Sequence, residues 1–89
     1  MQTAKRRTRS AMNDQNLLQE FGRLVRQTRK SRKVSAAKLG NELNLSIATI
    51  YKVEHGQYTH FFTRRRIANW LSTLSDELSV VREKFASIL

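Results

Sequence analysis

Residues 35–56 carry two short amphipathic helix patterns separated by only a few residues, and no other feature constrains the fold as strongly. Leu39 and Leu43 share one face of the first pattern at the i, i+4 spacing of an apolar stripe. Ile50 and Val53 share one face of the second pattern, three residues apart. The spacing predicts two adjacent helices that bury facing stripes.

The residues that flank these patterns are typical of helix ends. Ser35 and Ser46 suit N-caps, whose hydroxyls accept a hydrogen bond from an otherwise unpaired amide. Asn44 can adopt the left-handed backbone of a turn, and Gly56 suits the position just past the second helix. Gly40 lacks a β-carbon where a tight crossing needs room. Two helices joined by so short a turn form a helix-turn-helix, whose second helix can enter the major groove of DNA.

This segment resembles the phage repressor and Cro-like helix-turn-helix family, also called the xenobiotic-response-element type. The resemblance extends from about Phe21 to Leu78, and its motif positions fall at matching spacing: Val34-Ser35, Leu39-Gly40, Asn44-Leu45-Ser46, Thr49-Ile50 and Val53-Glu54-His55-Gly56. Ala36 stands where the family often has glutamine, Asn44 replaces a turn glycine, and the proline common after the second helix is absent. The resemblance implies a fold like that of lambda repressor and a DNA-binding function.

The resemblance also implies which residues contact DNA. Exposed positions at the start and on the outer face of the second helix contact bases in the family, and residues after that helix contact the DNA backbone. The predicted DNA-binding residues are Ala36, Ser46, Ile47, Ala48, Thr49, Tyr51, Lys52, His55, Tyr58 and Arg64. Ile47 and Ala48 can pack on thymine methyl groups, Thr49 can do this or form hydrogen bonds, and Lys52 can contact guanine or phosphate. The alternatives are a helix that packs on another protein segment and a solvated loop after it.

Two groups of charged residues have specific predicted roles. Family members often pair an arginine of the first helix with the glutamate that ends the recognition helix, and Arg29 and Glu54 occupy those aligned positions. Arg64, Arg65 and Arg66 lie in the expected first turn of a later helix, where cations oppose the helix dipole at about 0.3–1 kcal/mol each. Phosphate contacts would offset that cost. The alternative is a solvated face.

The net charge of +10 on 89 residues indicates a polyanionic partner, most simply double-stranded DNA, or else a solubilising surface. Residues 1–33 carry ten of the seventeen cations and two of the seven carboxylates. The chain has no cysteine and only two histidines, so we expect no metal site. It has no phosphate-binding glycine loop, nucleophile elbow or zinc-binding helix pair, so we expect neither an enzyme nor a cofactor. It has no apolar run long enough for a membrane span and no secretory signal, so we expect no membrane association and a cytoplasmic location.

The expected fold class is all-α, a compact bundle of four to five helices. Residues 1–12 are basic and unpatterned, which predicts a flexible arm, and residues 13–89 form the single DNA-binding domain with a C-terminal dimerisation helix. The first helix is expected from Asn13 or Asp14 to about Lys30. Thr63 is the expected N-cap of the fourth helix, which ends at Leu71 or Leu74. A last helix is expected from Ser75 to Ile88.

An apolar seam runs through the C-terminal segment at spacings of three and four: Leu71, Leu74, Leu78, Val81, Phe85 and Ile88. Such a seam favours packing against another helix. Its first half is expected to pack on the chain's own first helix. The predicted homodimer interface is therefore formed by Val81, Phe85 and Ile88.

The predicted function is sequence-specific DNA binding by a transcriptional regulator, a repressor that acts as a homodimer on a near-palindromic operator. The first alternative is an antitoxin of a toxin–antitoxin module, which also binds a toxin protein and regulates its own operon. The second alternative is a protein that coats nucleic acid through charge alone. Binding without sequence preference at moderate salt would favour this last alternative.

Overall fold

The chain folds into five α-helices and two short 3₁₀ helices, and no strand occurs in residues 2–89. The computed structural model describes the backbone of residues 2–89 and the side chains of residues 14–89. In chain order the elements are α1 (Gln2–Ser31), α2 (Ala36–Leu43), α3 (Ile47–Glu54), α4 (Phe61–Leu74), η1 (Glu77–Val80), α5 (Val81–Lys84) and η2 (Ala86–Ile88). The predicted all-α class and helix number are confirmed.

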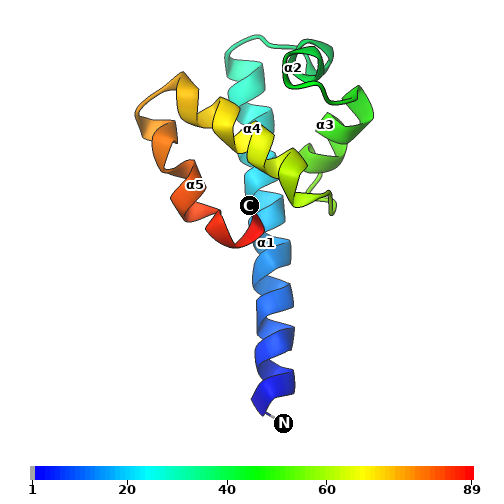
Figure 1. Cartoon of the computed structure of the whole chain (residues 1–89), viewed down its shortest axis with the longest axis vertical. Helices are drawn as coiled ribbons and strands as arrows, with labels where there is room; N and C mark the ends of the chain where they lie inside the picture. Colours follow the sequence, from blue (N-terminus) through cyan, green and yellow to red (C-terminus); the bar gives the residue numbers. More distant parts are fainter. Residues whose placement is uncertain (1) are drawn as a thin grey trace.

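The helices pack around the C-terminal half of α1. In Figure 1, α2 and α3 lie to one side of α1, α5 lies to the other side, and α4 crosses α1 between them. The most extensive contacts are between α1 and α3, between α2 and α3, and between α4 and the segments that follow it. Their shared core is almost inaccessible to solvent and includes Phe21, Val25, Leu39, Ile50, Ile67, Leu71 and Phe85. Phe21 and Phe85 pack edge to face, with ring centroids 5.3 Å apart.

The first helix begins at Gln2, although the sequence predicts an arm through Met12 and a helix start at Asn13 or Asp14. Residues 2–13 contain no proline or glycine, and they include several good helix formers, so no local signal stops the helix. The N-terminal part of α1 extends away from the other helices (Figure 1). Met1, the side chains of residues 2–13 and the predicted flexibility of the arm lie outside what the structure describes.

The predicted C-terminal helix is wrong, because the segment after Ser75 forms η1, α5 and η2 in succession. The backbone bends at Val80 and again at Phe85, so this segment wraps around the bundle instead of running straight. Apolar residues spaced three and four apart suit successive short turns as well as one long helix. Val81, Phe85 and Ile88 consequently lie in the chain's own core, with 3%, 1% and 5% of their surface exposed.

The predicted dimer interface on Val81, Phe85 and Ile88 is therefore wrong. A residue that is almost fully covered within its own chain has no surface left for a second copy.

The start of α4 also differs from the prediction. His60, not Thr63, is the N-cap, and its Nδ1 accepts a hydrogen bond from the Phe62 backbone N–H at 3.2 Å. The helix therefore begins at Phe61, two residues before the predicted cap. It ends at Leu74, one of the two predicted ends.

Candidate nucleic-acid interface

The α2–α3 unit has the caps and the turn that its sequence predicts. The Ser35 hydroxyl accepts a hydrogen bond from the Lys38 backbone N–H at 3.0 Å, and the Ser46 hydroxyl accepts one from the Thr49 backbone N–H at 3.1 Å. Asn44 adopts the left-handed conformation, with φ 58° and ψ 45°. Three residues therefore connect the two helices.

The turn lies directly against α2. The backbone N–H of Leu45 donates a hydrogen bond to the Gly40 carbonyl at 2.8 Å. A β-carbon at Gly40 would lie 2.5 Å from the Leu45 carbonyl oxygen, which is closer than atoms can approach. The absence of a β-carbon at Gly40 therefore makes room for the short turn. The sequence predicts that a tight crossing needs this room, whereas the atom that comes close belongs to the turn itself.

An ion pair joins the end of α1 to the end of α3, between the two residues that the sequence predicts. Arg29 donates from Nε to one Glu54 carboxylate oxygen at 2.6 Å and from Nη2 to the other at 3.1 Å. These hydrogen bonds raise the pKa of the Arg29 guanidinium. Arg29 also donates to the Val34 carbonyl at 3.0 Å, and both charged side chains are buried. The pair holds α3 at a defined position relative to α1.

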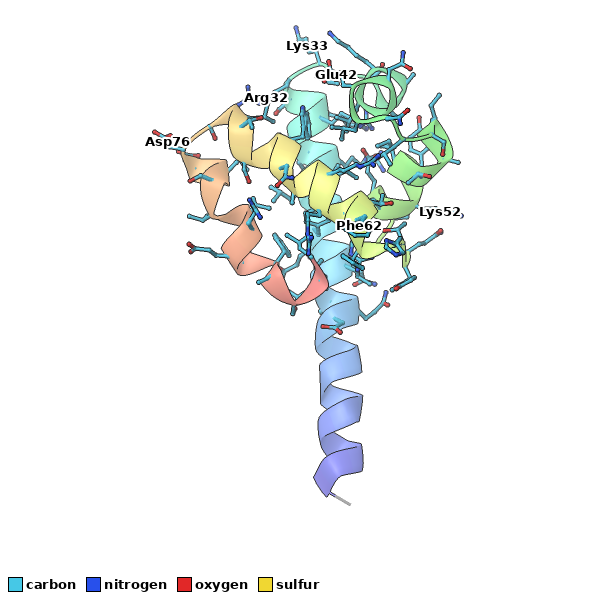
Figure 2. The ribbon with its side chains drawn as sticks, viewed as in Figure 1. Arg32, Lys33, Glu42, Lys52, Phe62 and Asp76 are labelled. Atoms are coloured by element: carbon cyan, nitrogen blue, oxygen red, sulfur yellow. The ribbon has the colours of Figure 1, made fainter. Side chains whose placement is uncertain are left out.

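The side of α3 that points away from the bundle forms a continuous exposed face. Ile50, Val53 and Glu54 are buried on the inner side. The exposed residues lie at positions i, i+1, i+4, i+5 and i+8 of one helix surface, and together they are called the outer face of α3: Ile47, Ala48, Tyr51, Lys52 and His55. Figure 2 shows the Lys52 side chain at the outer edge of the molecule. Five of the ten predicted DNA-binding residues therefore share one surface.

Three further predicted residues lie close to this face in sequence. Ser46 is exposed at the start of α3, and its hydroxyl lies 2.8 Å from the Thr49 hydroxyl. Thr49 is partly buried, so this contact occupies the group that was predicted to form hydrogen bonds to bases. Tyr58 follows α3 and is 75% exposed.

Two predicted DNA-binding residues are wrongly assigned. Ala36 is only 4% exposed, because it lies on the inner stripe of α2 with Leu39 and Leu43. Arg64 is only 5% exposed. It donates to the carbonyl oxygens of Thr59 and Ile88, the latter at 2.7 Å, and its guanidinium lies 5.3 Å from the Tyr58 ring centroid. Neither side chain can contact a DNA backbone from these positions.

All three consecutive arginines at the start of α4 contact backbone carbonyls. Arg64 contacts Ile88, Arg65 contacts the Leu89 carbonyl at 2.7 Å, and Arg66 contacts the Leu43 carbonyl at 3.3 Å. Carbonyls at helix ends lack partners within their helix, so Arg64 and Arg66 satisfy groups that η2 and α2 leave unpaired at Ile88 and Leu43. Burial lowers the pKa of the Arg64 guanidinium, which has no carboxylate among its hydrogen-bond partners. The cost of placing cations at a helix start is thus offset within the chain, without phosphate.

We expect Arg64→Ala to lower the free energy of unfolding by about 1–2 kcal/mol, because two carbonyl oxygens lose their hydrogen-bond donor. Urea unfolding measures this change. Arg65→Ala is the matched control, since Arg65 is exposed and its loss should cost less than about 0.5 kcal/mol. An Arg64→Ala variant that is as stable as the wild type would contradict the structural role of Arg64.

The surface also contains a group of aromatic side chains that the sequence prediction did not include. His60, Phe61 and Phe62, here called the aromatic cluster, stack with centroids 4.3–5.1 Å apart. Phe61 is 38% exposed and Phe62 is 55% exposed. The Arg65 guanidinium lies 5.2 Å from the Phe61 ring centroid. The sequence signal that could have predicted this cluster is the run of three consecutive ring-bearing residues where a loop meets a helix.

In the part of the chain that the structure describes, no three potential metal ligands are grouped together. No helix within this part combines the length and the apolar character that crossing a membrane requires.

Comparison of the chain with protein-family models, with curated proteins and with solved structures found no match.

Proposed function

We propose that this protein binds double-stranded DNA sequence-specifically, with α2 and α3 as a helix-turn-helix and α3 in the major groove. The observation that carries the proposal is the outer face of α3, which is exposed along two turns of a helix held by the Arg29–Glu54 pair. A single exposed helix of this length fits the width of the major groove. The spacing of the helix-turn-helix residues supports the same assignment.

The charge of the chain supports binding to a phosphate backbone. The chain has ten more cationic side chains than carboxylates, so ion pairs within the molecule cannot neutralise them all. Among the described side chains, Arg29 and Lys84 are the only cations in ion pairs. Lys38 on α2 is exposed, and Lys52 is exposed on the outer face of α3 itself. Such cations release counterions when they bind phosphates, and this release provides affinity without sequence preference.

The proposed cellular role is transcriptional repression by a cytoplasmic homodimer on a near-palindromic operator. A protein of this size can occlude a promoter by binding alone. A two-fold dimer would place two copies of α3 about 34 Å apart, on successive major grooves of one DNA face.

We expect Lys52→Ala to reduce the preference for a specific duplex over random DNA by about 1–3 kcal/mol, because a base contact is lost. Removal of residues 1–9 should instead weaken binding to both duplexes equally and reduce the salt dependence, since this segment carries four cations. Fluorescence anisotropy with both duplexes at several salt concentrations measures the two effects. If removing residues 1–9 alone abolished the preference, base recognition would not reside in α3.

The aromatic cluster is the surface that we assign to protein–protein contact. Exposed aromatic side chains are enriched in interfaces, and the seam predicted on Val81, Phe85 and Ile88 is buried. We expect Phe62→Asp to convert the dimer to a monomer, because each copy would place a carboxylate in the interface formed by the two aromatic clusters. Val80→Asp is the matched control, since Val80 is also exposed, at 54%, and lies outside the cluster.

The same cluster favours the second candidate function, an antitoxin-like protein whose partner is a different chain. Sedimentation of the wild type, Phe62→Asp and Val80→Asp separates the candidates. Loss of the dimer in Phe62→Asp alone would assign the cluster to the homodimer. A dimer that persists in Phe62→Asp, or a wild type that is monomeric, would indicate that the cluster binds a different protein.

A further inference from the structure

Only one residue of the outer face of α3, Lys52, is of a kind that distinguishes bases by paired hydrogen bonds. Arginine or lysine recognises guanine with two hydrogen bonds, and asparagine or glutamine recognises adenine in the same way. No arginine, asparagine, glutamine or carboxylate occurs among the five residues of the outer face. Recognition by the part of this face at the start of α3 must therefore use other chemistry.

Two hydrogen-bonding groups at the two ends of this face, the Ser46 hydroxyl and Nδ1 of His55, already have partners within the chain. The Ser46 hydroxyl accepts from the Thr49 backbone N–H and contacts the Thr49 hydroxyl at 2.8 Å. Nδ1 of His55 lies 2.8 Å from the Tyr51 carbonyl oxygen. The start of α3 consequently presents alkyl groups to its surroundings, from Ile47, which is 45% exposed, and from Ala48.

We infer that α3 recognises the 5-methyl group of pyrimidines in the major groove, which is the apolar group that base pairs present there. This inference rests on the proposed function and specifies its ligand. Thymine carries this methyl group in ordinary DNA, and 5-methylcytosine carries the same group at the same position. Ile47 and Ala48 supply the apolar surface, while Lys52 adds a contact to guanine. The preferred half-site is rich in thymine at the positions that face the start of α3.

The test replaces single thymines by deoxyuridine in a duplex selected from a random pool. This change removes one methyl group and keeps every hydrogen-bonding group of the base pair. We expect each contacted thymine to lose about fourfold in affinity, the value for removing one buried methylene-sized group. Positions outside the contact should show no change.

Protein variants identify the side chain responsible. Ile47→Ala should bring the ratio of thymine to uracil affinity close to one at the position that Ile47 contacts. Val80→Ala is the matched control, because Val80 is also an exposed apolar residue, at 54%, and lies outside α3, and it should leave the ratio unchanged. Replacing a contacted T·A pair by a 5-methylcytosine·G pair should give tighter binding than an unmethylated C·G pair. This arm distinguishes recognition of the methyl group from recognition of the thymine base as a whole.

The outcomes separate this inference from the proposed function. A duplex preference that survives every uracil substitution unchanged would overturn methyl recognition and leave sequence-specific binding intact. A protein that binds selected and random duplexes equally would overturn both. A fourfold loss that persists at every position in Ile47→Ala would show that Ile47 does not contact the methyl group and would overturn its assigned role.

Discussion

Replacing Glu54 by alanine is expected to lower the free energy of unfolding by about 2–4 kcal/mol. The Arg29 guanidinium would stay buried without its counter-charge, and breaking such a pair on one side is far more costly than losing an exposed pair. The geometry supports this magnitude, since both carboxylate oxygens accept from Arg29 and the Glu54 side chain is only 2% exposed. Urea unfolding at neutral pH measures the change.

The chain contains a matched control for this experiment. Lys84 and Glu20 form the other ion pair among the described side chains, at 3.6 Å, and their side chains are 62% and 43% exposed. Glu20→Ala should change the stability by less than about 0.5 kcal/mol, because water screens and solvates an exposed pair. Equal effects of Glu54→Ala and Glu20→Ala would show that the Arg29–Glu54 pair does not hold α3 in place.

Gly22→Ala is expected to destabilise the protein by about 2–3 kcal/mol, in the direction opposite to helix propensity. Within a helix, alanine is favoured over glycine by about 1 kcal/mol. A β-carbon at Gly22, however, would overlap the Val53 carbonyl oxygen and lie 2.7 Å from the Glu54 carbonyl oxygen. Both atoms belong to the backbone of α3, so the clash can be relieved only if α1 and α3 move apart.

A substitution on the exposed side of α1 separates the two effects. Gln27 is exposed in the same helix, so Gln27→Ala should change the stability by less than about 0.5 kcal/mol. Thermal unfolding followed by circular dichroism compares both variants with the wild type. A Gly22→Ala variant that is stabilised by about 1 kcal/mol would show that helix propensity dominates and that α1 and α3 are not in close contact.

The α2–α3 unit was predictable because its determinants are local. Each cap and the left-handed Asn44 depend on residues within four positions, and a sequence displays such relations directly. The Arg29–Glu54 pair spans 25 residues and could be predicted only through the family resemblance. The burial of Ala36 had a local signal, since Ala36, Leu39 and Leu43 share one stripe.

The C-terminal half of the chain was harder to predict because its determinants are distant in sequence. Arg64 contacts a carbonyl 24 residues away, which the sequence does not reveal. The sequence shows only that Arg64 is one of three adjacent arginines, and this pattern predicted a phosphate contact instead. Phe85 packs on Phe21 across 64 positions. The apolar spacing alone did not distinguish a segment that packs on the chain's own core from a helix that forms a dimer interface. Gly22 lies on the buried stripe of α1, but only the structure shows which backbone atoms approach it.

Selection of preferred duplexes from a random DNA pool, carried out at two salt concentrations, tests most directly whether α3 recognises DNA sequence. Phosphate contacts weaken strongly as salt rises, whereas discrimination between sequences depends on contacts to base edges. The account predicts that the recovered pool converges on an inverted repeat with thymine-rich half-sites about ten base pairs apart, and that the same sequence is recovered at the higher salt. A pool that remains random at both salt concentrations, despite tight binding at the lower one, would contradict the account and indicate a protein that coats nucleic acid through charge alone.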